Sequence, residues 1–334
     1  MNIPKTMAAI IAGTVSLSAI TAASAQSTSI SLAHGAAPDH PWNLAAQKFA
    51  EEVSEQSDGD ISVNIFTAGQ MGSEREMVEA TQSGSIQMSL VSTMAMSGTE
   101  PSLQVFDLPY LFPNEETAYE VLDGEIGEEV AAPLLNKGLR NLAYWENDYR
   151  QLSNDVRPIE SIEDVEGLKI RVPETPILMT WVEELGGVAT PIPYTELYGA
   201  LQQGVVDGQD NGILLMRSAN YYEVQDYYTL TRHIYAPVAF LVNENFYQSL
   251  SDESRGIIQT AAENARDYQR EISREAREQD LATMEEAGLQ ITELSDEAMQ
   301  EFQDSASPVY EAMRDVVNQE IVDRIRAIAD ENAS

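Results

Sequence analysis

The chain has 334 residues, of which 19 are Lys or Arg and 55 are Asp or Glu, so its formal net charge at pH 7 is −36. The length suggests two domains and a large buried core. So negative a surface argues against nucleic acid as a partner, because phosphates would repel it, and it disfavours anionic lipid. The sequence contains no Cys, so stability has to come from the core instead of from disulfides.

The first 25 residues have the features of a secretory signal peptide. Lys5 supplies the positive charge, residues 7–22 form an apolar run too short for a secure membrane span, and Ala23-Ser24-Ala25 matches an A-x-A cleavage signal. We therefore expect cleavage after Ala25 and a mature chain that is exported to the periplasm. Loss of Lys5 leaves 18 basic against 55 acidic side chains, a net charge of −37.

The next stretch alternates strand and helix patterns. Residues 27–35 and 61–66 are typical of strands, and residues 41–55 keep apolar side chains at helical spacing. Gly69 and Gly72 predict a turn, after which Ser73 and Glu76 form an S-x-x-E capping box that starts a further helix. This order of elements indicates an α/β domain with parallel strand pairing.

The same kind of pattern returns after residue 148. GLKIRV predicts a strand, residues 177–186 and 195–203 predict helices, and VVDGQDN (205–211) predicts a short buried strand that runs into a loop. The chain thus divides into two α/β units, at about 26–148 and 149–236, without a repeat that relates them.

Residues 251–287 predict one very long helix. This stretch has no Pro and a single Gly, and its apolar residues recur at helical steps up to Gly288. At 1.5 Å per residue such a helix is about 55 Å long, which exceeds one small domain, so we expect it to brace both units. The alternative is a break into two helices near residues 270–274.

The strand GLKIRV carries two cations. Leu168, Ile170 and Val172 alternate with Lys169 and Arg171, which is the period of a half-buried strand. One interpretation places both cations on a solvated outer face. The other places Arg171 in a cleft, where its guanidinium group binds an anion.

Signatures of catalysis are missing from the sequence. It has no G-x-S-x-G, no G-x-G-x-x-G and no phosphate-binding loop, and its three His residues stand alone at positions 34, 40 and 233. Without Cys and without a His pair at helical spacing, a zinc site is not expected. We predict that the protein is not an enzyme and uses no metal and no cofactor.

Five motifs carry a resemblance to a known family: GQMGSEREM (69–77), FDLPYLF (106–112), NDYRQLSN (147–154), VEGLKIRVPETP (165–176) and PIPYTELYGALQQGVVDGQDN (191–211). In this order they resemble the extracytoplasmic solute-binding subunits of TRAP transporters, the tripartite ATP-independent periplasmic family. The resemblance covers essentially the whole mature chain.

The resemblance implies a two-lobed α/β periplasmic-binding-protein fold with crossing strands, a hinge and a long helix that spans both lobes. We expect lobe I at 26–148 plus 237–276 and lobe II at 149–236 plus 277–334. It also implies that Arg171 binds the ligand carboxylate, a task for which the planar guanidinium is well suited. Lys169 is then a surface residue.

Further positions match ligand-facing positions of the family: Arg150, Asn211, Tyr194, Glu74, Ser92 and His34. For Asn211 a loop cap is the alternative, for Tyr194 core packing, and for Glu74 the favourable dipole of the helix start. His34 is preferred over His40 because it directly follows the first strand. Asp210 and His233 match a polar pair that supports the Arg strand.

Trp145 is expected either to line the pocket or to brace the hinge. The implied function is the capture of a small organic acid, most simply a sugar acid such as a uronate or an aldonate, for the membrane subunits of an ion-driven TRAP transporter. A C4-dicarboxylate is the alternative ligand, and a sensor subunit for a membrane receptor kinase is the alternative role. We expect a monomer.

Overall fold

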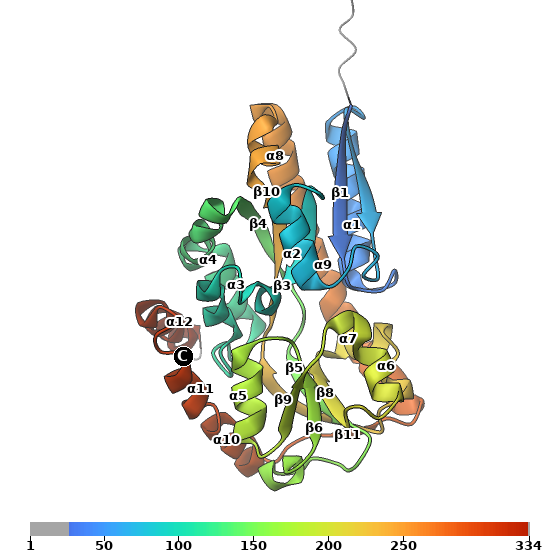
Figure 1. Cartoon of the computed structure of the whole chain (residues 1–334), viewed down its shortest axis with the longest axis vertical. Coiled ribbons are helices and arrows are strands. Elements are labelled where there is room, and N and C mark those ends of the chain that lie inside the picture. Colours follow the sequence, from blue (N-terminus) through green and yellow to red (C-terminus); the bar gives the residue numbers. More distant parts are fainter. Residues whose placement is uncertain (1–26, 333–334) are drawn as a thin grey trace, which may run out of the picture.

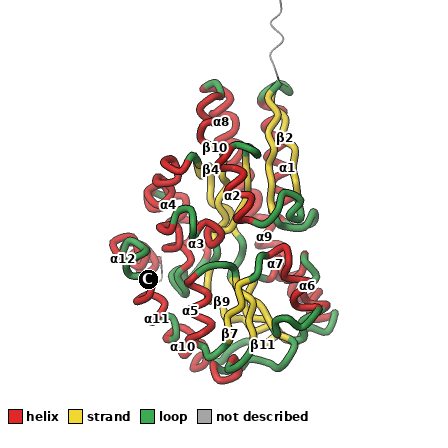
Figure 2. The backbone as a smooth tube through the Cα atoms, viewed as in Figure 1, coloured by secondary structure: helices red, strands yellow, loops and turns green. Residues whose placement is uncertain are grey.

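The computed structural model describes residues 27–332, so the predicted signal peptide and its cleavage site lie outside the described residues. Figure 1 shows an elongated molecule with two lobes stacked along its long axis. The strands gather in two separate groups, one in each lobe (Figure 2). The predicted α/β class and the two-lobed arrangement are confirmed.

Lobe I is built on a sheet with the strand order β2–β1–β3–β10–β4. Its strands are β1 (Thr28–His34), β2 (Ile61–Phe66), β3 (Met88–Ser92), β4 (Leu139–Glu146) and β10 (Pro237–Asn243). β1 pairs in parallel with β2 and β3, whereas β10 runs antiparallel to both β3 and β4. The one reversed strand of this sheet is therefore the strand that arrives from the other lobe.

Lobe II is built on a sheet with the strand order β11–β9–β5–β8–β6–β7. Its strands are β5 (Arg150–Asn154), β6 (Lys169–Val172), β7 (Val188–Pro191), β8 (Gly208–Asn211), β9 (Tyr227–Ile234) and β11 (Gln290–Thr292). β5 is antiparallel to β8 and β9, and the other pairings are parallel. The reversed strand is again a crossing strand.

Among the described residues, three connections join the lobes before residue 287, and the C-terminal residues 296–332 then pack against both lobes. The chain passes from β4 to β5 through residues 147–149 and from β9 to β10 through residues 235–236. The third connection is α9 (Asp252–Glu286), a continuous helix of 35 residues and about 52 Å, so the alternative break near residues 270–274 is wrong. Ser251 caps its first turn through its side chain.

Helix α9 contributes to the cores of both lobes. Ala261 and Ala265 pack with Phe49 under the lobe I sheet, and Met284 packs with Leu201 in lobe II. Its contacts run from α1 and β4 to α7. The brace that the sequence predicts is therefore present, while the predicted residue boundaries of the lobes stay a prediction.

The remaining helices cover the two sheets. They are α1 (Pro41–Gln56), α2 (Glu74–Ser83), α3 (Glu115–Asp123), α4 (Glu125–Ala131), α5 (Pro176–Glu184), α6 (Leu197–Gln202), α7 (Ile213–Ser218), α8 (Glu244–Ser249), α10 (Asp296–Asp304), α11 (Ser307–Ala312) and α12 (Gln319–Asn332). In the part of the chain described, no helix is both long enough and apolar enough to cross a membrane.

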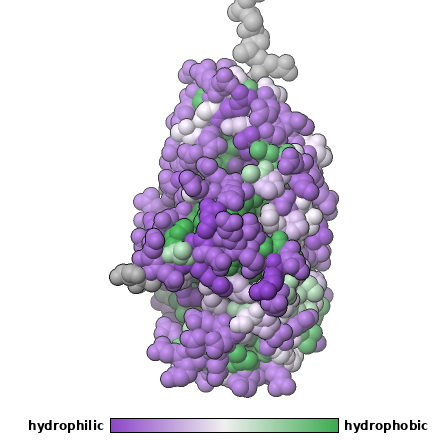
Figure 3. Space-filling view, turned by 90° about the vertical axis from the view of Figure 1, so that its left-hand side faces the viewer, coloured by the Kyte–Doolittle hydropathy of each residue, from purple (hydrophilic) through white to green (hydrophobic). Residues whose placement is uncertain are grey.

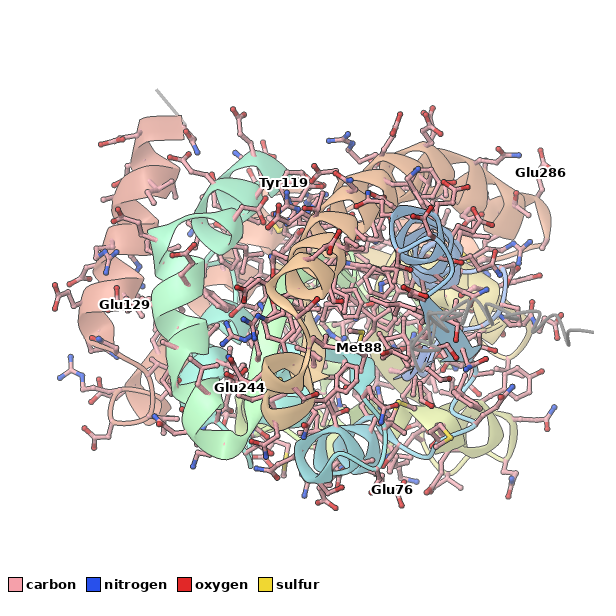
Figure 4. All side chains as sticks on the ribbon, turned by 90° about the horizontal axis from the view of Figure 1, so that it is seen from above. Glu76, Met88, Tyr119, Glu129, Glu244 and Glu286 are labelled. Atoms are coloured by element: carbon pink, nitrogen blue, oxygen red, sulfur yellow. The ribbon has the colours of Figure 1, made fainter. Side chains whose placement is uncertain are left out.

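The acidic side chains lie mainly on the surface. In Figure 4 the labelled Glu76, Glu129 and Glu286 lie at the periphery of the molecule, and all three are exposed. Figure 3 shows a face that is mostly hydrophilic, with small scattered apolar patches. This distribution agrees with the strongly negative composition.

The lobes touch each other on both sides of the cleft. Arg75 lies 3.7 Å from Glu174, and Arg217 lies 3.9 Å from Asp39. Gly69, at a φ of 68°, approaches lobe II so closely that a Cβ atom there would come within 2.6 Å of a Thr195 methyl carbon. The structure is thus a closed form, in which the cleft between the lobes becomes a cavity.

Candidate functional site

A narrow cavity, partly open to solvent, lies between the lobes. In this closed form its free volume is about 30 Å³, which is below the usual range for small-molecule sites, about 300–1,000 Å³. Six of the predicted ligand-facing residues line it: Glu74, Ser92, Arg150, Arg171, Tyr194 and Asn211. They come from both lobes and from helix, strand and loop segments more than a hundred residues apart in the sequence.

Arg171 lies on β6 and is 2% exposed, whereas Lys169 on the same strand is exposed. Its Nε atom donates a hydrogen bond to the carbonyl oxygen of Ile192 at 2.7 Å. Burial lowers the pKa of the Arg171 guanidinium, and the charge of Asp210 opposes this. Among the described residues no carboxylate lies within 4.0 Å of its nitrogens, so this buried cation lacks a direct counter-ion.

Arg150, at the start of β5, differs because it has an internal partner. Its Nε and Nη2 atoms donate to the side-chain and backbone oxygens of Asp210, both at 2.5 Å. Burial alone would raise the pKa of Asp210, but the Arg150 charge and the His233 hydrogen bond lower it overall. The Arg150 guanidinium is therefore held in a fixed orientation at the cavity wall.

His233 completes this polar network behind Arg150. Its Nε2 atom lies 3.4 Å from Asp210 Oδ2, and its Nδ1 atom is 2.8 Å from the Thr231 hydroxyl. The ring of Trp181 stacks on the imidazole at a centroid distance of 4.1 Å. Burial lowers the pKa of His233, while Asp210 opposes that shift. Asp210 and His233 thus form a pair that contacts Arg150 on β5, and their predicted support of the Arg171 strand stays a prediction.

Glu74 is placed in the cavity by the start of α2. The predicted capping box is present, since Ser73 accepts from the Glu76 N–H and the Glu76 carboxylate accepts from the Ser73 N–H. Glu74 is therefore the first residue of the helix, and its Oε1 atom accepts a hydrogen bond from the Ser92 N–H at 2.9 Å. Burial raises the pKa of Glu74, and the Ser92 hydrogen bond and the two arginines oppose the rise.

Tyr194 and Asn211 form part of the lobe II wall. A Cβ atom on Gly35 of lobe I would lie 3.5 Å from the Tyr194 ring, so the ring packs against the opposite lobe. The Asn211 side-chain amide donates to Gln209 Oε1 at 2.6 Å. One amide hydrogen and the carbonyl oxygen of Asn211 are left for other partners.

Of the predicted ligand-facing residues, His34 lies outside the lining of this cavity, as do its alternative His40 and the supporting residue Trp145. His34 is buried in lobe I, where its Nε2 atom is 3.4 Å from Asn43 Oδ1, and His40 caps α1 by accepting from the Trp42 N–H. Burial lowers the pKa of His34 to about 4 and that of His40 to about 3. Trp145 packs against Phe240 in the lobe I core, directly before the first crossing.

Five lining residues were not predicted: Gly35, Trp42, Asn147, Pro173 and Leu215. Trp42 donates from its Nε1 atom to the Glu146 carbonyl oxygen at 2.8 Å, and its ring forms one wall. Asn147 and Pro173 stand inside motifs that the family resemblance had singled out. The alternation of the strands gave no signal for them, because both lie in loops.

A larger groove of about 410 Å³ lies on the outer surface, between α4, β4 and α9. Its arginines are already paired, since Arg140 binds Glu244 at 2.7 Å and Arg266 lies 3.3 Å from Asp123. This groove therefore offers no free cation to an anionic ligand. The described residues also hold no group of three or more His, Asp or Glu arranged for a metal ion.

The charges around the interlobe cavity nearly balance. Two guanidinium groups, Arg150 and Arg171, face two carboxylates, Asp210 and Glu74. Because one cation is paired internally, the arrangement suits a ligand with one carboxylate and with hydroxyl groups that use the remaining donors and acceptors.

Comparisons with known proteins were made on the sequence and on the fold. The model of the family described as bacterial extracellular solute-binding protein, family 7, matches residues 32–315. The C4-dicarboxylate-binding periplasmic protein DctP of Rhodobacter capsulatus is 32% identical over 301 residues, which cover 89% of this chain and 90% of that protein.

Two solved structures have the same fold over nearly their full length. The sugar acid binding protein DctPAm of Advenella mimigardefordensis strain DPN7T, in complex with galactonate, is 34% identical with a TM-score of 0.89, and the match covers 92% of this chain and 99% of that chain. A TRAP periplasmic solute binding protein of Sulfurospirillum deleyianum DSM 6946, with bound succinate, is 27% identical with a TM-score of 0.87, covering 90% and 99%.

Proposed function

Because the chain belongs to family 7 of the bacterial extracellular solute-binding proteins, the binding subunits of TRAP transporters, we propose that it captures a small organic acid in the periplasm. It then delivers this acid to the membrane subunits of the transporter. The family is one of transport proteins and not of enzymes, which fits the lack of catalytic motifs in the sequence.

The buried charge of Arg171 supports this proposal most directly. Its guanidinium group is buried at the wall of the interlobe cavity without a carboxylate in ion-pair distance among the described residues. A buried cation without a counter-ion is costly, and a ligand carboxylate relieves that cost with charge-assisted hydrogen bonds. Binding of a ligand carboxylate therefore stabilises the closed form, in which Arg171 is buried.

A sugar acid is the ligand class that we propose. Glu74 supplies an acceptor for hydroxyl protons and repels a second ligand carboxylate. Asn211 adds an amide that can serve the carboxylate or a hydroxyl group. The solved relative that binds galactonate is consistent with this choice.

A C4-dicarboxylate is the second candidate. Two guanidinium groups line the cavity, and the relative from Sulfurospirillum deleyianum holds succinate in the same fold. It is less favoured because Arg150 already has Asp210 as its partner, so that only one cation is free for the ligand.

A thermal-shift screen of the mature chain, residues 26–334, separates these candidates. Galactonate, gluconate, galacturonate, glucuronate, succinate, malate and sialic acid are tested at equal concentration, and calorimetry follows for every acid that stabilises the fold. Stabilisation by a hydroxylated monoacid supports the proposal. Stabilisation by succinate or malate alone refutes the sugar-acid class, and stabilisation by no acid in the set argues against the acid-binding role.

A further inference from the structure

The first crossing between the lobes contains a charged side chain with no direct place in the binding cavity. Asp148 is 1% exposed, and its φ of 72° lies in the left-handed region, which Gly, Asn and Asp tolerate best. A buried carboxylate on such a backbone costs free energy unless other groups compensate its charge.

The Asp148 carboxylate binds three parts of the molecule at once. Its Oδ2 atom accepts from the N–H of Ile213, the first residue of α7, at 3.0 Å, and its Oδ1 atom accepts from the Tyr149 N–H at 2.8 Å. Arg277 of α9 places its Nε atom 3.2 Å from the same Oδ1. The crossing segment, α7 and the long helix therefore meet at one carboxylate.

Arg277 is itself held by two further carboxylates, one on α3 and one at the end of β4. It donates to Glu115 at 2.7 Å and pairs with Glu146, the last residue of β4. Glu146 also accepts hydrogen bonds from Tyr119 and Tyr235, at 2.6 and 3.2 Å. Because Tyr235 lies in the second crossing, this network connects α9 to both crossing segments.

The neighbours of Asp148 are cavity residues. Asn147 directly precedes it and Arg150 follows two residues later, and α7, which it holds at Ile213, presents Leu215 to the cavity. At Gly212, between Asn211 and Ile213, a Cβ atom would come within 2.7 Å of Asp148 Cβ. The two backbones are therefore packed tightly between Asp148 and the segment that carries Asn211 and Ile213.

We propose that Asp148, paired with Arg277, is a positioning residue for ligand binding. It holds the crossing segment against α7 so that Arg150, Asn147 and Asn211 keep the orientation that the ligand needs, and it restricts the hinge to a defined range. The first of these roles rests on the proposed function of the cavity, whereas the restriction of the hinge does not.

Two substitutions at this position separate the charge from the backbone. Asp148→Gly removes the carboxylate without adding strain, but it also frees the backbone, so an effect is assigned to the charge only where Asp148→Asn shows it in the same direction. Asp148→Asn tolerates the same φ and keeps an acceptor for the Ile213 N–H, but it lacks the charge for Arg277. Arg255→Gln is the matched control, because Arg255 lies on the same helix in an exposed pair with Asp252.

The chain has no Cys, so Glu55→Cys on α1 and Glu183→Cys on α5 give spin-label sites on opposite lobes of the otherwise unchanged mature protein. Double electron–electron resonance then measures the interlobe distance distribution without ligand. We expect a broader distribution for Asp148→Gly than for the wild type and the Arg255→Gln control. Calorimetry with galactonate should give at least tenfold weaker binding for Asp148→Gly and a smaller loss for Asp148→Asn.

The two measurements also separate this proposal from the proposed function. If galactonate fails to bind the wild type, the choice of ligand is wrong, and the distance distributions alone decide the role of Asp148. A distribution for Asp148→Gly as narrow as that of the wild type overturns the proposal. A broader distribution with unchanged galactonate affinity overturns it as well, since a purely structural residue would give that result.

Discussion

The Nε atom of Arg171 donates a hydrogen bond to the carbonyl oxygen of Ile192, which follows the neighbouring strand β7, at 2.7 Å. This bond fixes the plane of the guanidinium group. The terminal nitrogens make no hydrogen bond to any of the described residues, so they can form the two parallel bonds that a carboxylate accepts. Strand pairing in lobe II thus orients the guanidinium group that we propose binds the ligand carboxylate.

Substitution of Arg171 should abolish or strongly weaken acid binding. We expect Arg171→Ala to cost roughly 3–5 kcal/mol, the usual loss when one partner of a buried pair is removed, which is about two to three and a half decades in Kd. Arg171→Glu should abolish binding. Lys169→Ala is the control, because that side chain is exposed on the same strand. Calorimetry that finds both alanine variants within threefold of the wild type would disprove the assignment.

Ligand binding should shift the protein from an open to a closed form. The lobes are linked by two short crossings, by α9 and by the C-terminal helices, of which α12 contacts α3. Short crossings permit hinge motion, and the closed contacts include the exposed pair of Arg75 and Glu174. Small-angle X-ray scattering of ligand-free and saturated protein should show a smaller radius of gyration with ligand. Identical scattering profiles, from protein first proven to be ligand-free, would contradict the hinge.

The buried carboxyl group of Asp107 should make stability depend on pH. Its Oδ1 atom accepts from the Thr93 hydroxyl at 2.6 Å, while its Oδ2 atom has no partner in the described structure. Burial raises the pKa of Asp107 to about 7, although the Thr93 hydrogen bond opposes the rise. Between about pH 4 and pH 7, Asp107 is therefore protonated in the folded state and ionised in the unfolded state.

The sign follows from proton linkage. Because the folded state binds more protons in this range, the free energy of unfolding falls as pH rises, by up to about 4 kcal/mol from this group. In urea titrations Asp107→Asn should gain stability relative to the wild type at pH 8 and lose that advantage at pH 5. Glu79→Gln, at an exposed position, serves as the control. An equal difference at both pH values would refute the buried-acid interpretation.

The sequence allowed the prediction of those parts of the site that depend on local patterns. Strand alternation left Arg171 either in the cleft or on the outer face, and the family resemblance of its motif favoured the cleft. The S-x-x-E box at Ser73 and Glu76 predicted the helix start that carries Glu74. The absence of Pro between residues 251 and 287 predicted a helix that proves continuous. Each of these features depends on residues that lie close together in the sequence.

Contacts between distant segments could not be predicted in this way. Asp148 and Arg277 are 129 positions apart and meet only because α9 runs past the first crossing. His34 was expected near the ligand from the family resemblance and was preferred over His40 because it follows the first strand. It instead lies 3.4 Å from Asn43 of α1, and Trp42 lines the cavity. Which side chain of a loop reaches the cavity depends on how the lobes pack, and a single sequence carries no periodic signal for that.

Glu74 should decide between one and two carboxylates on the ligand. Its Oε1 atom accepts from the Ser92 N–H, and its negative charge lies in the same cavity as Arg171. A second ligand carboxylate would meet this charge at short range in a partly dry site, where two like charges repel by a few kcal/mol at an effective dielectric constant of about 20. A hydroxyl group would instead donate a hydrogen bond to it.

Glu74→Gln tests this role, because the amide keeps the size and the acceptor oxygen but removes the charge. We expect the affinity for succinate to rise relative to that for galactonate by about tenfold or more, which is ~1.4 kcal/mol. Glu76→Gln is the matched control, since Glu76 is an exposed residue of the same turn that caps the helix outside the cavity. Calorimetric affinities for both acids give the ratio directly. A ratio that stays the same in Glu74→Gln and in the wild type would mean that Glu74 does not face the part of the ligand that distinguishes the two acids, whereas the carboxylate role of Arg171 would be unaffected.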